Sequence, residues 1–528
     1  MTRVLTHPLR AIRNWHSALP PIRRVLNWAL VGLVVGSLVA VGVVTLTPDR
    51  SCGAGVDKRA DDDECTGVTD GGHAFMAELG PVSDRIKAEN TKVTKSGKAY
   101  ATIALMIPMT FTEDDVAERA QVVREVQGAY LAQYRANHES ADEPAIRLVL
   151  ANPGRDMARW KEVSDQLAGM ARSGKDRLRA VFGFNLSVTR TEQTIAYLTR
   201  EKGIAVVGGP ITADDLGNDR ENPRRYPGLA KIVPSNRDQA RALTHHLKVK
   251  PRDTFLVEDT HADDLYARSL RAAFRAETKG TPYSEQYDSS KAIPNDFVQM
   301  VNNLCDSRAT TVYFSGRPPA LAQLIRALGK RGCADQRYRV VTVSGASTLA
   351  YDPTMDWDAF SYGAGLTVEY ATITHESAWT TGNPPGTGGS AADFRDLSKL
   401  VGDDEKDDEK GEKASGVGDI GPTGLADGRT ITTYDSAATA IAGIRNRTTT
   451  KGQVPDLDSI AAAWPRLHGD QMVRGASGWI CLNGYGTPYD KAVAIVRLSP
   501  RKDRHIEFEK LAWPDGHPPA EQCTAAPD

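Results

Sequence analysis

The sequence predicts an α/β protein with two doubly wound lobes, each a parallel sheet with helices on both faces, preceded by one N-terminal transmembrane helix. Three observations predict this fold. From residue 99 onward, short apolar runs alternate with amphipathic stretches of helical length, which is typical of parallel sheets covered on both faces. The alternating units are too many for one open sheet of ordinary size. Residues 25–47 form an uncharged run beside an arginine-rich flank.

The first 50 residues predict the location of the protein. Residues 1–24 carry five arginines and no acid, and residues 25–47 carry no charge. About 20 apolar residues span a bilayer, and basic flanks stay on the cytoplasmic side. We therefore expect a basic cytoplasmic segment at 1–24, a single-pass anchor in the cell membrane at 25–47, and an extracytoplasmic body that begins with a stalk at 48–98. A cleaved signal peptide is the alternative, but residues 44–47 lack its small-residue cleavage pattern.

The alternating elements of the body can be placed in order along the chain. Each predicted strand is short, apolar and rich in β-branched or aromatic residues. The predicted strands are 100–108, 146–151, 180–184, 204–207, 254–258, 311–314 and 339–343. The predicted helices lie between them, at 114–135, 155–174, 191–202, 237–247, 262–277, 296–304 and 319–330.

Two later segments break this alternation. Residues 381–427 begin with a Gly- and Pro-rich stretch, and residues 403–413 carry seven acids and three lysines. This composition predicts a disordered acidic insertion. Residues 501–528 are polar and are interpreted as a C-terminal tail.

Six cysteines are expected to form disulfides, because the body is predicted to be exported. Six cysteines allow fifteen pairings. Proximity in the sequence favours Cys52–Cys65, Cys305–Cys333 and Cys481–Cys523. No cysteine or histidine spacing is typical of a metal site, so we expect no metal.

Composition and missing motifs exclude several classes of function. The 65 basic and 67 acidic residues nearly cancel, which argues against a nucleic-acid-binding protein. No GxxxxGK[ST] loop, no GxSxG elbow and no GxGxxG loop after the first strand are present. We therefore expect no enzyme activity and no cofactor.

Five segments, in this order and spacing, resemble the type I periplasmic solute-binding proteins, a group that includes branched-chain amino-acid-binding proteins. Residues 103–110 resemble the first strand and its ligand-facing loop, and residues 181–189 resemble a strand with a Ser/Thr loop that opens a helix. Residues 204–216 and 311–332 resemble later strand–loop units. Two late signatures complete the resemblance, at 434–437 and 475–486.

The resemblance implies a bilobed clamshell with three crossings between the lobes, near 233–236, 362–368 and 466–475. Lobe 1 would comprise 99–234 and 368–466, and lobe 2 would comprise 235–366 and 467–500. The ligand would bind in the cleft, at the carboxyl ends of the strands.

The candidate ligand-binding residues follow from this resemblance. In lobe 1, hydroxyl groups and a close-approach glycine stand in loops before helices, although such hydroxyls are also ordinary helix caps. Lobe 2 lacks the Tyr-Gly and the ammonium-binding acid that amino-acid binders usually carry. Asp259 or Asp263 would replace that acid, and Arg317 would pair with an anionic ligand. The candidates are Ser187, Thr189, Gly209, Thr212, Asp263, Arg317 and Ser344.

The sequence therefore favours a membrane-tethered extracytoplasmic protein that closes on a small polar ligand, such as an amino acid or a related metabolite. It would serve ABC-type uptake through a separate permease, or ligand sensing. The alternative is a sensor or interaction module that keeps the fold and signals to a membrane partner without transport.

Overall fold

The computed structural model describes residues 51–59, 63–139, 143–291, 294–402, 417–501, 505–521 and 523–524, with scattered positions between 20 and 33. Within this described part, no helix is long and apolar enough to cross a membrane. Most of the predicted cytoplasmic segment 1–24, most of the predicted anchor 25–47 and the whole acidic run 403–413 lie outside the described residues. The chain divides into residues 1–51 and 52–528, and the second unit carries both lobes.

Lobe 1 is built on an eight-stranded sheet with the order β1-β2-β3-β5-β4-β6-β7-β8. Strands β4 to β8 are parallel, and β3 joins them antiparallel to β5. The strands are β1 (Ser51–Gly53), β2 (Val56–Lys58), β3 (Cys65–Thr69), β4 (Tyr100–Met106), β5 (Ala145–Asn152), β6 (Leu178–Gly183), β7 (Ala205–Gly208) and β8 (Leu229–Lys231).

Lobe 2 is built on a seven-stranded sheet with the order β10-β9-β11-β12-β13-β14-β15. Strands β9 to β13 are parallel, and β14 and β15 extend the sheet in antiparallel pairs. The strands are β9 (Thr254–Asp259), β10 (Tyr283–Tyr287), β11 (Thr311–Ser315), β12 (Tyr338–Val343), β13 (Leu366–Thr372), β14 (Val493–Leu498) and β15 (Ile506–Ala512). Two parallel-sheet lobes are the predicted fold class, which is confirmed.

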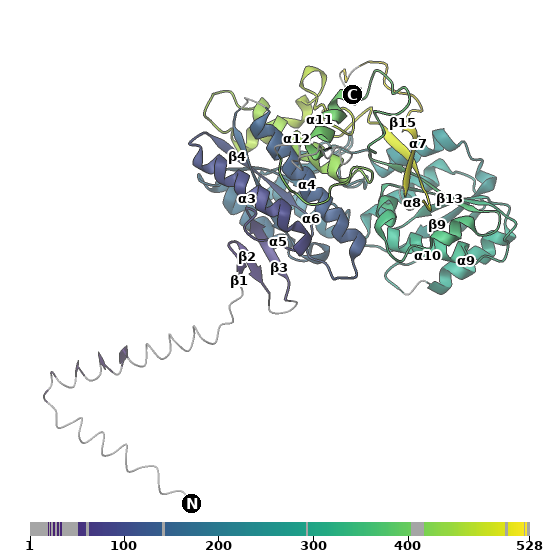
Figure 1. Ribbon diagram of the computed structural model, residues 1–528, viewed down its shortest axis with the longest axis horizontal. Coiled ribbons are helices and arrows are strands. Elements are labelled where there is room, and N and C mark those ends of the chain that lie inside the picture. The colour runs from purple at the N-terminus through teal and green to yellow at the C-terminus, as the bar shows by residue number, and fades with distance from the viewer. Residues whose placement is uncertain are drawn as a thin grey trace, which may run out of the picture. The chain divides into compact units, whose positions relative to one another are not determined.

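Helices cover both faces of each sheet (Figure 1). Those of lobe 1 are α3 (Gly80–Lys95), α4 (Val116–His138), α5 (Trp160–Arg172), α6 (Thr189–Ala196), the π-helix η3 (Tyr197–Glu201), α11 (Ala391–Val401), α12 (Arg429–Asn446) and α13 (Leu457–Ala461). Those of lobe 2 are α7 (Asn236–Leu247), α8 (Leu265–Glu277), α9 (Pro294–Asp306), α10 (Pro318–Leu328) and the 3₁₀ segments η5 (Ser344–Tyr351) and η6 (Trp357–Ser361). Shorter 3₁₀ turns are η1 (Ala77–Leu79), η2 (Arg155–Met157), η4 (Pro251–Asp253), η7 (Trp464–Arg466) and η8 (Gly469–Gln471).

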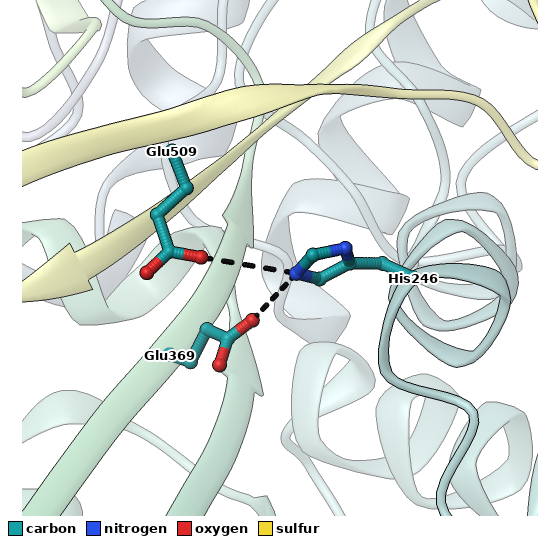
Figure 2. Close-up of side chains that lie close together, drawn as sticks. All are labelled: His246, Glu369 and Glu509. Atoms are coloured by element: carbon teal, nitrogen blue, oxygen red, sulfur yellow. Dashed lines mark ion pairs between the residues drawn. The ribbon is translucent and has the colours of Figure 1, made fainter.

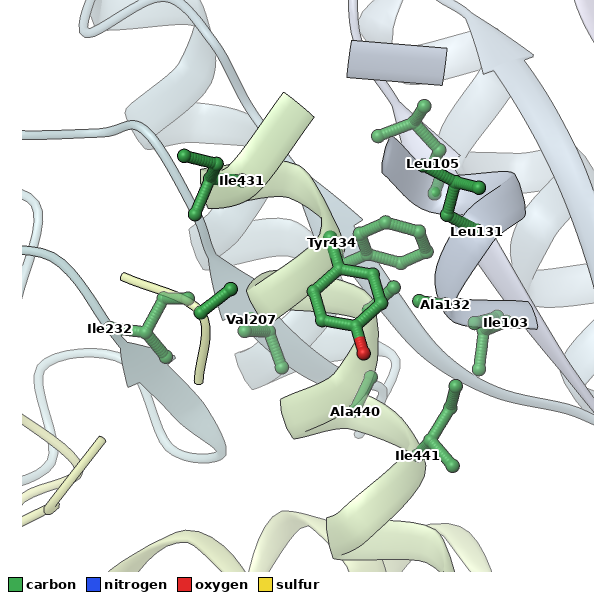
Figure 3. Close-up of a cluster of buried hydrophobic side chains, with 14 of the residues drawn as sticks. Ile103, Leu105, Leu131, Ala132, Val207, Ile232, Ile431, Tyr434, Ala440 and Ile441 are labelled. Atoms are coloured by element: carbon green, nitrogen blue, oxygen red, sulfur yellow. The ribbon is translucent and has the colours of Figure 1, made fainter. Parts of the chain in front are cut away.

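The core of lobe 1 forms where α12 and α4 pack together over the sheet (Figure 3). Ile103 and Val207 from the strands meet Tyr434 and Ile441 from α12, and all four are buried. A Cβ atom at Gly128 of α4 would lie 2.3 Å from the carbonyl oxygen of Thr430, so glycine permits this close helix crossing. The contact places the late segment 429–446 inside lobe 1.

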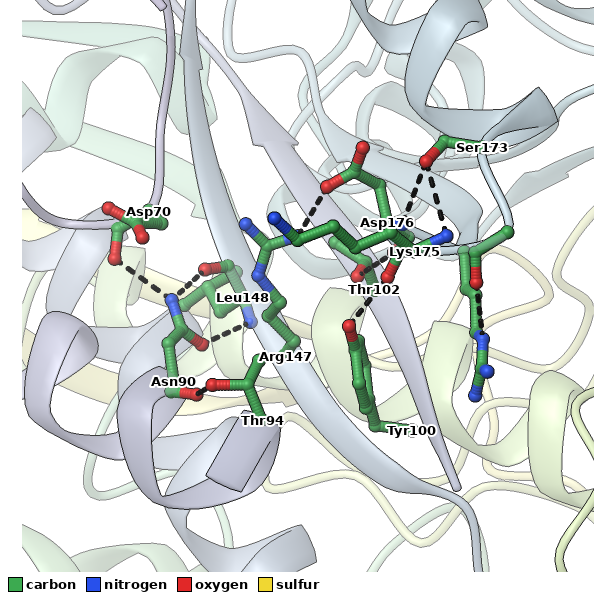
Figure 4. Close-up of polar contacts among 12 residues, drawn as sticks. Asp70, Asn90, Thr94, Tyr100, Thr102, Arg147, Leu148, Ser173, Lys175 and Asp176 are labelled. Carbon is green, nitrogen blue, oxygen red and sulfur yellow. Dashed lines mark hydrogen bonds and ion pairs between the residues drawn. The ribbon is translucent and has the colours of Figure 1, made fainter. Parts of the chain in front are cut away.

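Part of the predicted stalk belongs to lobe 1, because its polar groups are bonded into the sheet. Asn90 of α3 donates to the carbonyl oxygen of Leu148 at 2.6 Å and accepts from the Leu148 amide at 3.0 Å (Figure 4). The side-chain amide of Asn90 also donates to the carbonyl of Asp70 at 2.9 Å, next to β3. Residues 51–98 therefore extend the lobe instead of standing apart from it.

The crossings between the lobes differ in part from their predicted positions. The first lies between β8 and α7, in the predicted interval 233–236. The second comes after β13 and not at 362–368, because β13 pairs with β12 over its whole length. The third comes just before β14 and not at 466–475, because the amide of Lys231 donates to Gly486 at 2.8 Å and holds that segment on lobe 1.

After β15 the predicted tail returns to lobe 1. The carbonyl of Pro519 accepts from Thr387 Oγ1 at 2.6 Å, and the carbonyl of Cys523 accepts from the Gly469 amide at 2.8 Å. The chain thus passes four times between the lobes. The three favoured disulfides, Cys52–Cys65, Cys305–Cys333 and Cys481–Cys523, are confirmed, and the last one ties this tail in place.

The predicted insertion 381–427 is ordered on both sides of its acidic run. Residues 391–401 form α11, and the segment after 416 packs along α4. Gln127 donates to the carbonyl of Ile420 at 2.9 Å, and the hydroxyl of Tyr130 donates to that of Val417 at 3.1 Å. Apolar residues on either side of the charges account for the difference from the predicted disorder.

Candidate functional site

A cavity of about 760 Å³ lies between the lobes and is lined by both. Lobe 1 contributes the loops after β4 and β6 and the start of α4 and α6. Lobe 2 contributes the loops after β9 and β11 and the segment η5. Parallel strands end at one edge of their sheet, so these loops converge on one cleft. The cavity is lined on its polar side by Asp115, Glu118, Gln121, Arg155, Asp156, Asn185, Thr189, Arg190, Gln193, His261, Asp263, Asp264, Arg317, Thr348 and Arg429.

A bidentate ion pair forms one wall of the cavity. Arg317 donates to Asp264 through Nε at 2.7 Å and through Nη2 at 2.9 Å. Asp264 also caps α8 by accepting from the Ala267 amide at 3.0 Å. Burial opposes the charge on Arg317, but Asp264 outweighs it and raises the pKa of the guanidinium. The pair is therefore held in the charged form.

The same arginine reaches across the cleft to lobe 1. Its Nη2 donates to the carbonyl of Ser187 at 3.1 Å, and the amide of Tyr266 donates to that carbonyl at 3.1 Å. Beside them the amide of Thr189 donates to the carbonyl of Asp263 at 3.3 Å. We call Arg317, Asp264 and Ser187 the cleft bridge. These direct contacts hold the two lobes together on one side of the cavity.

A second set of contacts joins the lobes at the rim. Arg268 of α8 pairs with Asp215 at 2.7 Å, and both side chains are nearly half exposed. The Asp214 amide donates to Ser269 Oγ at 3.0 Å. Exposed pairs of this kind contribute about 0.2–1 kcal/mol each, so the rim adds less to closure than the cleft bridge.

The opposite wall of the cavity carries three acids, Asp115, Glu118 and Asp156, and three arginines, Arg155, Arg190 and Arg429. Burial raises the pKa of Glu118, and the carboxylates of Asp115 and, in lobe 2, Asp352 raise it further. Asp115 has a cation of its own, since Arg155 lies 3.4 Å away. No described cation lies within ion-pair distance of Glu118. Glu118 therefore presents an unpaired carboxyl group on a wall whose formal charges balance.

Behind this wall, α12 supplies a buried base to the cavity. Arg429 Nη1 lies 3.5 Å from Oε1 of Glu125, which also accepts from Gln121 at 2.9 Å. Asn185 donates to the other oxygen of Glu125 at 2.7 Å, and the Asn185 Oδ1 atom has no hydrogen-bond partner among the described residues. Burial raises the pKa of Glu125, and Arg429 opposes that rise. Asn185 thus lines the cavity and holds a buried acceptor without a partner among the described residues.

The structure divides the seven predicted residues into two groups. Thr189, Asp263 and Arg317 line the cavity. The other four lie behind it. The Ser187 and Thr212 side chains are buried, and Ser344 donates its amide to Gln239 at 3.3 Å. A Cβ atom at Gly209 would lie 2.3 Å from Ser436 Oγ, so this glycine serves packing on α12.

Four further residues at the site carried no clear signal in the sequence. Asp264 looks like an ordinary helix cap, and its ionic partner Arg317 is far away in the chain. Glu118 and Arg429 lie on helices whose exposed faces hold many similar charges. Asn185 stands in the predicted Ser/Thr loop, where the resemblance indicates hydroxyl groups as ligand contacts and not an amide. Only the fold brings these groups to one cavity.

A second buried polar cluster lies where the chain crosses between the lobes. Asp435 of α12 accepts from the amides of Ala476 and Ser477, both at 2.8 Å, and from the Ser477 hydroxyl. Lys491 donates to Ser477 Oγ at 2.9 Å and to the carbonyl of Gly478 at 2.7 Å. We call Asp435, Ser477 and Lys491 the hinge cluster. It joins the two late sequence signatures to the start of β14.

Burial shapes the charges of this cluster. It lowers the pKa of Lys491 to about 8, against the attraction of Asp435. It also raises the pKa of Asp435, while Lys491 and Ser477 oppose that rise. Neither side chain lines the cavity, so the cluster is structural.

Comparisons with known proteins place the fold. No protein-family model matches the chain, and no curated protein does. Among solved structures, an ABC transporter substrate-binding protein from Desulfitobacterium hafniense in complex with Leu matches 78% of this chain and 99% of its own, with a TM-score of 0.53 and 14% identity. The fold is that of the type I periplasmic binding proteins.

Two further structures show the range of this fold. A leucine-binding protein from Thermotoga maritima matches 79% of this chain and 99% of its own, with a TM-score of 0.52 and 16% identity. A solute-binding protein from R. palustris in complex with 4-hydroxybenzoate matches 78% and 96%, with a TM-score of 0.52 and 13% identity. At such identities the likeness concerns the fold, and the ligand of this chain must be argued from its own cavity.

Proposed function

We propose that the body of this protein is an extracytoplasmic solute-binding module whose two lobes close on a small polar ligand. The observation that carries the proposal is the cavity itself, because loops from both sheets supply its polar lining. A ligand that touches both lobes shifts an open–closed equilibrium toward the closed state. The solved structures of the same fold, which include ABC transporter substrate-binding proteins, support this proposal.

The charges of the cavity favour a ligand that carries a cationic group. Glu118 has no cation within ion-pair distance among the described residues, and Asn185 Oδ1 is an unused acceptor at the same cavity. An ammonium or guanidinium group would donate to Glu118. An amino acid or a related polar metabolite fits, with its anionic part toward Arg155 or Arg190 on the cavity wall.

The cleft bridge limits how such a ligand is held. In the closed arrangement Arg317 is used by Asp264 and Ser187. The side chains of Ser187 and Thr212 are buried away from the cavity. The ligand would therefore lie toward the α4 and α6 side of the cleft and leave the cleft bridge intact.

The cellular setting is part of the proposal. The uncharged run at 25–47 would anchor the chain in the cell membrane with the body outside, and the three disulfides suit an oxidising compartment. A separate ABC permease would take the ligand, since the sequence holds no ATP-binding loop.

A second candidate function is a sensor that signals to a membrane partner without transport. The contacts that favour it are those between the lobes, since Arg317–Ser187 and Arg268–Asp215 join them directly. A body that closes by itself could present a closed surface to a partner, and a ligand would then modulate that state.

A ligand screen on the purified full chain tests the proposal. Thermal unfolding would be measured with amino acids, basic amines, organic acids and aromatic acids, followed by calorimetry on any hit. A ligand at 100 times its Kd adds about 2.7 kcal/mol of stability. We expect a cationic or zwitterionic hit whose affinity falls at least tenfold in Glu118→Gln. The matched control is Glu277→Gln, at the C-terminal end of α8 and outside the cavity lining.

The result also separates the two candidate functions. A hit that is weakened by Glu118→Gln and unchanged by Glu277→Gln supports solute binding. A folded protein that responds to no class of ligand would contradict solute binding and leave the partner-binding sensor as the better account.

A further inference from the structure

Lobe 2 holds a cluster of three possible metal ligands far from the cleft loops. His246 lies in the last turn of α7, Glu369 on β13 and Glu509 on β15 (Figure 2). His246 Nε2 lies 2.9 Å from Oε1 of Glu369 and 3.8 Å from Oε2 of Glu509. The three ligand atoms all lie within 4.8 Å of one another. Three separate elements thus direct one nitrogen and two oxygens to a single point.

The second oxygen of each carboxylate is held by an arginine. Arg339 Nε lies 3.6 Å from Oε2 of Glu369, and Arg497 Nη1 lies 3.5 Å from Oε1 of Glu509. Each glutamate therefore turns one oxygen to an arginine and the other to the imidazole. Partners behind the ligands orient them in this way at metal centres.

The oxygen of Glu369 that faces the imidazole lacks a regular hydrogen bond. The Glu369 side chain is 8% exposed, and its Oε1 atom accepts no hydrogen bond from the described residues, although His246 Nε2 is near. A buried carboxylate oxygen without a hydrogen bond raises the free energy of the folded state. A cation placed between Oε1 and Nε2 would satisfy it.

We propose that His246, Glu369 and Glu509 form a binding site for a divalent transition-metal cation of the zinc class. One imidazole nitrogen and two carboxylate oxygens are a ligand set that Zn²⁺ accepts, with a water molecule in the fourth position. Metal–ligand bonds of 2.0–2.2 Å in a tetrahedron set the ligand atoms about 3.3–3.6 Å apart. The observed 2.9 and 3.8 Å bracket this separation.

The position of the site suggests what it does. It connects α7, the first helix after the first crossing, to β13 and β15, the strands that precede the second crossing and the return of the tail. A bound cation would fasten the edge of lobe 2 from which these connections leave. No spacing in the sequence indicates this site, because the three ligands stand far apart in the chain.

Metal titration of the tag-free full chain tests the site. The protein would be dialysed against a chelator and titrated with Zn²⁺ by calorimetry, in competition with a chromophoric chelator. We expect one Zn²⁺ per chain. His246→Ala and Glu509→Gln should each weaken binding at least tenfold, whereas His245→Ala, which changes the exposed neighbouring histidine, should leave it unchanged.

A second measurement distinguishes this site from surface binding and from misfolding. X-ray absorption at the zinc edge should show one nitrogen and two or three oxygens around the metal, and circular dichroism should show that Glu509→Gln is folded. Zn²⁺ binding that persists in both ligand variants, or no binding at all by the folded wild type, would overturn the proposal. In that case a proton on His246 would be what joins the two glutamates.

Discussion

The hinge cluster and the cleft bridge are both acid–base groups, the first buried and the second partly buried, yet they stand in different mechanical positions. The hinge cluster joins Asp435 in lobe 1 to Lys491 in the third crossing, where the chain is continuous between the lobes. The cleft bridge joins Arg317 of lobe 2 to the Ser187 carbonyl of lobe 1 across a gap. Opening the cleft would break the contact between Arg317 and the Ser187 carbonyl, whereas the Arg317–Asp264 pair within lobe 2 and the hinge cluster would stay intact. The difference shows that similar chemistry can serve stability in one place and a conformational equilibrium in another.

The largest effect is expected from breaking the hinge cluster. Lys491→Met would leave Asp435 buried without its cation, and removal of one partner from a buried pair costs about 3–5 kcal/mol. Denaturant unfolding should show this loss. Lys330→Met, at an exposed lysine, is the matched control and should stay within about 0.5 kcal/mol of wild type. A loss below about 1 kcal/mol for Lys491→Met would show that the cluster does not hold the hinge.

A smaller loss of stability and a larger change of shape are expected from the cleft bridge. Arg317→Met would leave Asp264 without its bidentate partner, and we expect a loss of about 2–3 kcal/mol because the arginine is partly exposed. Small-angle X-ray scattering should show a larger radius of gyration than in wild type. Lys491→Met, compared under conditions where it is folded, should not show that increase. An unchanged radius in Arg317→Met would mean that other contacts keep the lobes closed.

The pair Arg268–Asp215 at the rim extends the comparison, because it joins the two lobes where both side chains are exposed to water. Arg268→Ala would remove the 2.7 Å pair with Asp215 and is expected to cost at most about 1 kcal/mol. The loss should shrink as salt rises from 0.05 to about 0.5 M, because exposed charges are screened. A loss that does not depend on salt would point to packing of the arginine stem instead of charge.

The smallest effect on the free energy of unfolding is expected at Glu118, where the substitution should stabilise the protein instead of destabilising it. Its folded pKa is raised, so the folded state binds its proton more tightly than the unfolded state, and stability falls as pH rises above the ordinary value near 4.5. Glu118→Gln should therefore stabilise the ligand-free protein at pH 7 by less than about 1 kcal/mol. The gain should vanish below about pH 4, where both states of the wild type are protonated. Thermal unfolding at the two pH values measures it.

Much of the fold could be predicted from the sequence because its strands are apolar on both faces. Two of the strands that were missed lack this feature. β10 holds three consecutive polar residues at the edge of its sheet, and β13 carries the buried Glu369. The crossings after β13 and before β14 were misplaced for the same reason, since their positions depend on strand pairing and not on local pattern.

The candidate site was less predictable, because its lining depends on which side of a loop faces the cleft. Thr189 and Ser187 stand two residues apart in one loop, yet only Thr189 lines the cavity. Gly209 was expected to approach a ligand, and it approaches Ser436 of α12 instead. The pairing of Arg317 with Asp264 joins two loops of lobe 2, and nothing in either loop specifies the other.

The return of the tail to lobe 1 bears on how far the lobes can rotate. Three connections between two lobes act as a hinge about which the lobes can rotate. A fourth connection, fastened by Cys481–Cys523 and by the Gly469–Cys523 hydrogen bond, adds resistance to both bending and twisting about that hinge. The angle through which lobe 2 swings should therefore be narrow, and its elastic recoil should be fast. Under the proposed function, ligand binding would then be accompanied by small, quick changes of angle instead of a wide opening.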